Sequence, residues 1–116
     1  MIRVVFMDDY EPSRVVFGKL FREFRPTLVA DTDDWREILA RPFDVVFLNV
    51  RMGRCDGFEV AAYLREVVGY KGPIYAITGL HETQLTEDEV GVFDRVFTKA
   101  MEGNREEMMR ILREIE

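Results

Sequence analysis

Short runs of apolar residues alternate along this chain with longer amphipathic segments. The short runs predict five β-strands, at Ile2–Met7, Thr27–Ala30, Asp44–Asn49, Ile74–Thr78 and Arg95–Thr98. Three of these strands are apolar at consecutive positions, which is typical of strands covered on both faces, as in a parallel sheet.

The amphipathic segments between the runs predict five helices. The first follows Pro12, a residue that suits a first helical turn, and places Val16 and Leu20 on one face. The other four are predicted at Thr32–Ala40, Gly57–Val68, Glu82–Val92 and Asn104–Ile115. Strand and helix alternate five times, so the pattern predicts an α/β fold: a three-layer (βα)5 sandwich around a five-stranded parallel sheet. With 116 residues, we expect one domain spanning positions 1–116.

Composition narrows the possible functions without choosing one. The net charge of −6 disfavours binding to the phosphate backbone of nucleic acids. A single cysteine, Cys55, excludes an internal disulfide and paired-cysteine zinc motifs. No apolar stretch reaches the ~20 residues that span a bilayer, and the N-terminal pattern is not that of a secretory signal. We therefore expect a cytoplasmic protein that does not insert into membranes.

Polar residues that could bind a ligand or take part in chemistry lie at the ends of several predicted strands. Asp8 and Asp9 follow the first, Asn49 ends the third, Thr78 ends the fourth, and Lys99 follows the fifth. Ligand sites of open parallel sheets form beyond the carboxyl ends of the strands, so one crevice could gather these side chains. Two adjacent carboxylates need a neutralising partner, which could be Mg²⁺ or the ammonium group of Lys99.

These residues resemble the pocket of the response-regulator receiver domain of two-component signalling, whose fold is flavodoxin-like. The resemblance covers all 116 residues. It implies that Asp8 and Asp9 are the acidic metal-binding pair, that Thr78 is the phosphate-sensing hydroxyl residue, and that Lys99 contacts the phosphoryl group. Asp56-Gly57, at the start of the third predicted helix, matches the family's "DG" turn.

The phospho-acceptor aspartate of that family falls on Asn49, whose neutral amide cannot attack phosphorus. We therefore expect no phosphotransfer or autodephosphorylation at this position, and no enzymatic turnover. Mg²⁺ could still bind through Asp8, Asp9, the backbone carbonyl of Arg51 and, weakly, Asn49, but with lower affinity because one carboxylate is lost.

Three further positions depart from the family pattern. Gly53 stands where a proline is usual, so the loop after the third strand is expected to be more flexible. Ala100 follows Lys99 where the family has a proline after a cis bond, and a cis bond before alanine would cost ~3 kcal/mol. Val96 occupies the position of the aromatic switch residue, and alternation is expected to point Phe97 to the other face.

The origin of Asn49 has three interpretations. The acceptor could be lost naturally, an aspartate could have been changed in the laboratory, or the asparagine could be converted to aspartate by deamidation, which bulky Val50 would slow. In the second case the protein is a conventional Mg²⁺-dependent single-domain response regulator. A weaker alternative is a phosphohydrolase with Asp8 as nucleophile, although Tyr10 stands where such enzymes commonly have a second aspartate.

The favoured hypothesis is a stand-alone receiver-like module that acts by protein–protein interaction. The expected partner is a histidine kinase or a downstream signalling protein, and the expected state is a monomer or weak dimer. The surface that carries most output contacts in the family corresponds here to Glu82–Val92, Arg95–Lys99 and Asn104–Ile115.

Overall fold

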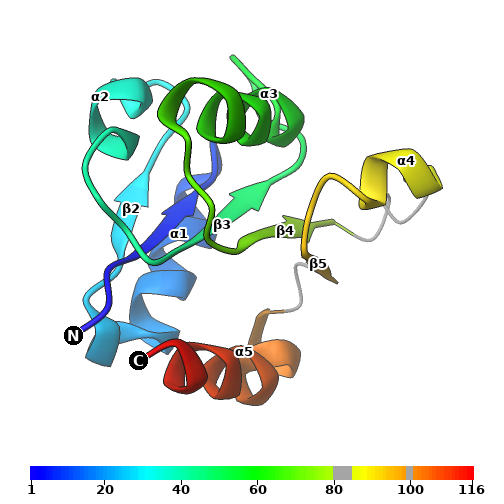
Figure 1. Ribbon diagram of the computed structural model, residues 1–116. Helices are drawn as coiled ribbons and strands as arrows, with labels where there is room; N and C mark the ends of the chain where they lie inside the picture. Colours follow the sequence, from blue (N-terminus) through cyan, green and yellow to red (C-terminus); the bar gives the residue numbers. More distant parts are fainter. Residues whose placement is uncertain (80–84, 99–100) are drawn as a thin grey trace.

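Five parallel strands form one sheet in the computed structural model, which describes residues 1–79, 85–98 and 101–116 (Figure 1). The strands are β1 (Val4–Met7), β2 (Thr27–Val29), β3 (Val45–Asn49), β4 (Ile74–Thr78) and β5 (Arg95–Thr98). Their order across the sheet is β2-β1-β3-β4-β5, and every neighbouring pair is parallel. The predicted strands and the three-layer α/β fold class are thereby confirmed.

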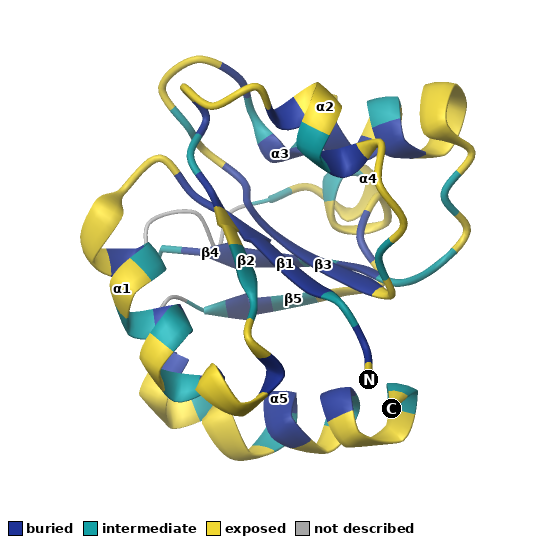
Figure 2. Ribbon diagram, turned by 90° about the vertical axis from the view of Figure 1, so that its left-hand side faces the viewer, coloured by how far each residue is buried: buried dark blue, intermediate teal, exposed yellow. Residues whose placement is uncertain are grey.

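The α-helices are α1 (Glu11–Leu20), α2 (Trp35–Leu39), α3 (Gly57–Tyr63), α4 (Glu87–Val90) and α5 (Met101–Ile115). A 3₁₀ turn, η1 (Arg22–Phe24), follows α1, and a π-helical segment, η2 (Leu64–Val68), follows α3. Helices α1 and α5 cover one face of the sheet, and α2 and α3 cover the other (Figures 1 and 2). Among the described residues, no helix is long and apolar enough to cross a membrane.

Some predicted helix boundaries and one predicted core residue are wrong. Helix α5 begins at Met101, so Asn104, the predicted start, lies inside the helix, and its side-chain amide donates to the Thr98 carbonyl (3.2 Å). Helix α2 begins at Trp35, not at Thr32. The apolar pattern of Gly57–Val68 predicts that Val68 is buried, but Val68 is exposed, and it lies in η2, where the chain no longer follows the α-helical period. Part of the predicted Glu82–Val92 helix lies outside the described residues.

Consecutive side chains of each central strand enter opposite core clusters. Val5 and Met7 pack on the α2–α3 side, whereas Val4 and Phe6 pack on the α1–α5 side. The same alternation separates Val96 from Phe97, as predicted: Val96 packs on the α2–α3 side, and Phe97 is buried on the other. This double coverage explains the consecutive apolar positions in the sequence.

Aromatic stacking fixes α1 on the sheet. Phe17 is fully buried, and its ring lies 4.3 Å from that of Phe6, nearly parallel to it. Phe21 and Phe47 are the next ring neighbours of Phe17, with centroids 4.7 and 5.4 Å away. Helix α1 begins at Glu11, with Tyr10 as its N-cap, two residues after the Asp8-Asp9 pair.

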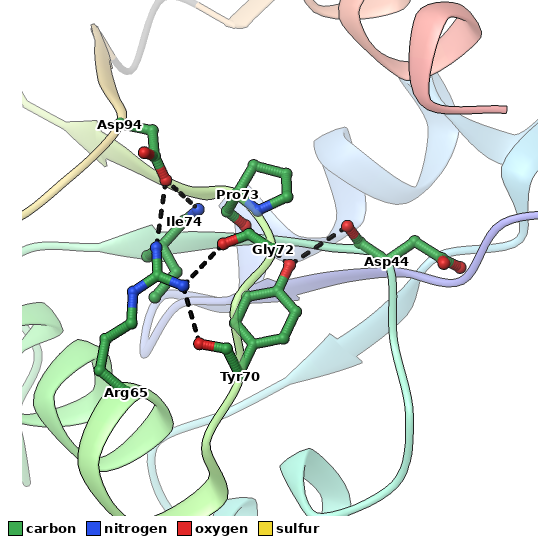
Figure 3. Close-up of polar contacts among 7 residues, drawn as sticks. All are labelled: Asp44, Arg65, Tyr70, Gly72, Pro73, Ile74 and Asp94. Atoms are coloured by element: carbon green, nitrogen blue, oxygen red, sulfur yellow. Dashed lines mark hydrogen bonds and ion pairs between the residues drawn. The ribbon is translucent and has the colours of Figure 1, made fainter.

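A guanidinium group joins the chain segments where β4 and β5 begin (Figure 3). Arg65 donates to the carbonyl oxygens of Tyr70 and Gly72, both at 2.8 Å, and pairs with Asp94 at 3.3 Å. The Asp94 carboxylate also accepts from the backbone amide of Ile74 (2.8 Å). These contacts connect the start of η2 to the chain where β4 and β5 begin, at the amino ends of the strands. The candidate site lies at the opposite, carboxyl ends of the strands.

Candidate functional site

The register of the sheet brings Asp8 and Asn49 together. Met7 is paired with Leu48 across β1 and β3, so the residues that follow, Asp8 and Asn49, stand at the same level. Both are buried, with 0% and 2% of their surface exposed, whereas Asp9 is exposed. The prediction that the β1 and β3 ends would meet at one edge is confirmed.

The side-chain nitrogen of Asn49 connects three oxygen atoms. Nδ2 lies 3.0 Å from Asp8 Oδ1, 3.4 Å from Asp9 Oδ1 and 2.7 Å from the backbone carbonyl oxygen of Arg51. Hydrogen bonds from an amide stabilise the buried negative charge of Asp8, which would otherwise be costly in this environment. Asn49 therefore links the end of β1 to the loop after β3.

The orientation of the Asn49 amide follows from its surroundings. Rotating the amide by half a turn would place Oδ1 against two carboxylates and a carbonyl, and all four oxygens would repel one another. In the observed orientation Oδ1 is buried, and no donor among the described residues reaches it. The hydrogen bonds of the nitrogen therefore outweigh one unsatisfied carbonyl oxygen.

The loop after β3 is held in place by Asp31, a residue that the sequence analysis did not single out. Asp31 is buried near the end of β2, and its carboxylate accepts from the backbone amide of Arg54 at 2.7 Å. Gly53 lies beside it: a Cβ added there would be 3.4 Å from Asp31 Oδ2 and 3.8 Å from Asp9 Oδ2. The rule that singled out Asp8, an acid close after a predicted strand, could have found Asp31 as well.

The Asp56-Gly57 pair opens α3, as predicted. Asp56 is the N-cap, and its side chain accepts from the backbone amide of Glu59 at 2.8 Å. Gly57 packs against the end of β3, where a Cβ would lie 2.7 Å from the carbonyl oxygen of Asn49 and 3.1 Å from Val50 Cα. Glycine is required here by close backbone approach.

The remaining predicted site residues differ in how far they are buried and in whether the structure describes them. Thr78 is buried at the end of β4, one position beyond Ile77, the partner of Asn49 across β3 and β4. The Arg51 side chain is exposed, and only its backbone carbonyl joins the contacts of Asn49. Lys99 and the Lys99–Ala100 bond lie outside the described residues.

Cys55, on the same loop, is buried. Burial, followed by the nearby carboxylates of Glu59 and Asp31, raises the pKa of the Cys55 thiol to about 11. The thiol therefore stays protonated and unreactive near neutral pH, as expected for most single cysteines.

A magnesium ion fits part of this pocket. The carboxylates of Asp8 and Asp9 and the Arg51 carbonyl are hard oxygen ligands of the kind that Mg²⁺ prefers. The Asn49 nitrogen among them is a hydrogen-bond donor and does not fit a cation at the same position. Within the described part of the chain, no group of three or more acidic, histidine or cysteine side chains could hold a metal.

Solved structures with the same fold are receiver domains. The chain aligns over 100% of its length with 99% of a CheY-like response regulator receiver domain from Methylobacillus flagellatus, with a TM-score of 0.76 and 20% identity. It also aligns over its whole length with the whole of the response regulator TrrA from Thermotoga maritima, solved with Mg²⁺ and BeF, with a TM-score of 0.77 and 18% identity. A third similar structure is the receiver domain of a sensor histidine kinase from Pseudomonas aeruginosa, with magnesium in its active-site cleft (TM-score 0.76, 19% identity, 97% and 95% of the two chains).

No family model matches the chain. The likeness in structure nevertheless defines the class of fold: the chain has the five-stranded, flavodoxin-like fold of receiver domains.

Proposed function

We propose that this protein is a receiver-like module of two-component signalling that is not phosphorylated at the usual position and acts by binding another protein. The observation that carries the proposal is Asn49. It ends β3 at the position of the acceptor, and its nitrogen is committed to hydrogen bonds with Asp8, Asp9 and the Arg51 carbonyl. An amide with this bonding has no anionic oxygen with which to attack a phosphoryl group.

The other pocket residues take supporting roles in this proposal. Asp8 and Asp9, with the Arg51 carbonyl, bind Mg²⁺ more weakly than a pocket with a third carboxylate. Thr78 stands at the position of the hydroxyl residue that senses the phosphoryl group, and Lys99 at that of the lysine that contacts it. The module has no catalytic turnover, because the group that would be phosphorylated and hydrolysed is absent.

The phosphohydrolase alternative loses support from the geometry of Asp8. Its carboxylate is fully buried and accepts from the Tyr10 backbone amide (3.0 Å) and the Asn49 side chain (3.0 Å). A nucleophile needs access to its substrate, and this carboxylate has none.

The partner surface in this proposal comprises the described parts of Glu82–Val92, Arg95–Lys99 and Asn104–Ile115. Val90 and Val92 expose 42% and 43% of their surface there, beside a first turn of α4 that carries three acids, Glu87, Asp88 and Glu89. Exposed valines bordered by charge suit a protein surface. The partner is a histidine kinase or a downstream signalling protein.

The test of the proposal is phosphorylation. The purified chain is incubated with Mg²⁺ and either acetyl phosphate or a phosphorylated histidine kinase, and its intact mass is measured with and without prior treatment with hydroxylamine, which removes acyl phosphates. We expect no added phosphoryl group. An acyl phosphate mapped to residue 49 would refute the proposal.

A second candidate is a conventional receiver that carries an Asp→Asn change. The acidic pair and the buried hydroxyl of Thr78, retained at the strand ends, favour it. Asn49→Asp distinguishes the two candidates: Mg²⁺-dependent phosphorylation of the variant supports the conventional receiver. A folded variant that accepts no phosphate supports natural divergence.

A further inference from the structure

Three oxygen atoms from separate parts of the chain converge on one nitrogen, where a hard cation would be expected. Asp8 Oδ1 and Asp9 Oδ1 come from the end of β1, and the Arg51 carbonyl from the loop after β3. All three lie within 3.4 Å of Asn49 Nδ2. Amide hydrogens carry partial positive charge and here take part of the neutralising role that a cation would have.

We infer that the side-chain amide of Asn49 occupies the cation position, so that the acidic pocket is closed without metal and a cation competes with Asn49 instead of being bound by it. This inference deepens the proposed function and rests on it for the identity of the pocket.

The buried oxygen of the same amide supports this inference. Oδ1 has no hydrogen-bond donor among the described residues, yet the side chain keeps its nitrogen toward the acids. The protein therefore retains the orientation that stabilises Asp8 and Asp9 at the expense of one unsatisfied carbonyl. For Asn49 to become a metal ligand, its amide would have to rotate and lose all three hydrogen bonds, so the cation must first displace them.

The variant Asn49→Ala shows whether this side chain blocks the cation position or binds the cation, because the two roles change the affinity for Mg²⁺ in opposite directions. If the amide blocks the cation position, its removal frees the two carboxylates and the Arg51 carbonyl, and the affinity for Mg²⁺ rises. If Asn49 is instead a ligand, the same change removes a ligand and the affinity falls. Asn104→Ala is the matched control, because it removes the chain's other asparagine amide, which donates to Thr98 and not to the acids.

Mg²⁺ is titrated into metal-stripped, ¹⁵N-labelled protein, and the backbone amide shift of Asp9 gives the affinity. We expect Asn49→Ala to bind Mg²⁺ about tenfold more tightly than the unchanged chain, a change of the size that altered metal surroundings produce. Asn104→Ala is expected to leave the affinity unchanged. Equal or weaker binding by Asn49→Ala, or an equal gain in Asn104→Ala, would overturn the inference.

A second measurement needs no variant and applies if Asn49→Ala does not fold. In excess EDTA, the Asn49 side-chain NH₂ protons are expected to exchange with water more than about tenfold slower than those of free asparagine, because they are buried and bonded. Exchange at the rate of free asparagine would contradict the inference. Either failure leaves the mass-spectrometric result intact, so the cation inference and the proposed function can fail separately.

Discussion

Replacing Gly57 by alanine tests whether the close packing of α3 against β3 holds the site together. The new Cβ would lie 2.7 Å from the Asn49 carbonyl oxygen and 3.1 Å from Val50 Cα, both backbone atoms that cannot rotate away. Restoring ordinary contact, at 3.4 Å or more, requires a shift of about 0.7 Å in the helix or the strand. Such overpacking costs about 1–3 kcal/mol, and the lower entropy of the unfolded alanine chain offsets about 0.4–1 kcal/mol of that.

We therefore expect Gly57→Ala to lower the free energy of unfolding by about 1–2 kcal/mol, which corresponds to roughly 4 °C in Tm for each kcal/mol in a domain of this size. The matched control is Gly103→Ala in α5, where an added Cβ meets nothing within 4 Å. That variant is expected to gain about 0.5–1 kcal/mol from helix propensity. Urea denaturation followed by circular dichroism measures both, and a Gly57→Ala protein as stable as Gly103→Ala would refute the packing argument.

Three other variants or conditions test the fold and the loop. Phe17→Ala removes a fully buried ring and is expected to destabilise the domain by about 3–5 kcal/mol in urea denaturation. Arg65→Ala is expected to lower the free energy of unfolding by about 1–2 kcal/mol. Arg113→Ala, which breaks an exposed pair with Glu23, is expected to change it by less than about 0.5 kcal/mol. Cys55 is expected to react slowly with iodoacetamide at about pH 8, because its thiol stays protonated. The contribution of the protonated thiol to the free energy of unfolding is complete below pH 9 and is lost as the pH rises toward about 11.

Each of these expectations has a contrary result. A loss below about 1 kcal/mol in Phe17→Ala would mean that the core repacks around the missing ring. If Arg65→Ala and Arg113→Ala lowered the free energy of unfolding equally, the contacts of Arg65 would have no special role in stability. Alkylation of Cys55 at the rate of a free thiol, without unfolding, would show that the loop opens readily.

The sequence predicted the sheet well because the central strands are covered on both faces. Consecutive apolar positions favour strands that are buried on both faces, and in a parallel sheet the carboxyl ends of β1 and β3 lie on the same side. That Asp8 and Asn49 lie close together could be predicted from the parallel arrangement of β1 and β3 alone.

Helix boundaries were less predictable because local hydrogen bonds compete with helix propensity. The Asp33 side chain accepts from the Ala30 backbone amide at 2.8 Å, which favours a turn and delays the start of α2 until Trp35. In α5, Asn104 was the predicted start, yet the helix begins at Met101 and the Asn104 amide bonds to Thr98.

The orientation of the Asn49 amide could not be predicted from the sequence. It depends on acceptors that lie 41 and 40 positions away, at Asp8 and Asp9, and on the backbone conformation that turns the Arg51 carbonyl toward them. The role of Asp31 likewise depends on where the loop after β3 folds back, at Arg54.

The contacts of Arg65 hold together the chain at the amino ends of two neighbouring strands. The chain is fastened where β4 and β5 begin, by a charged group that bridges carbonyl oxygens and a carboxylate. One side chain therefore joins residues that lie 29 positions apart in the chain, and it holds the start of β4 close to the start of β5.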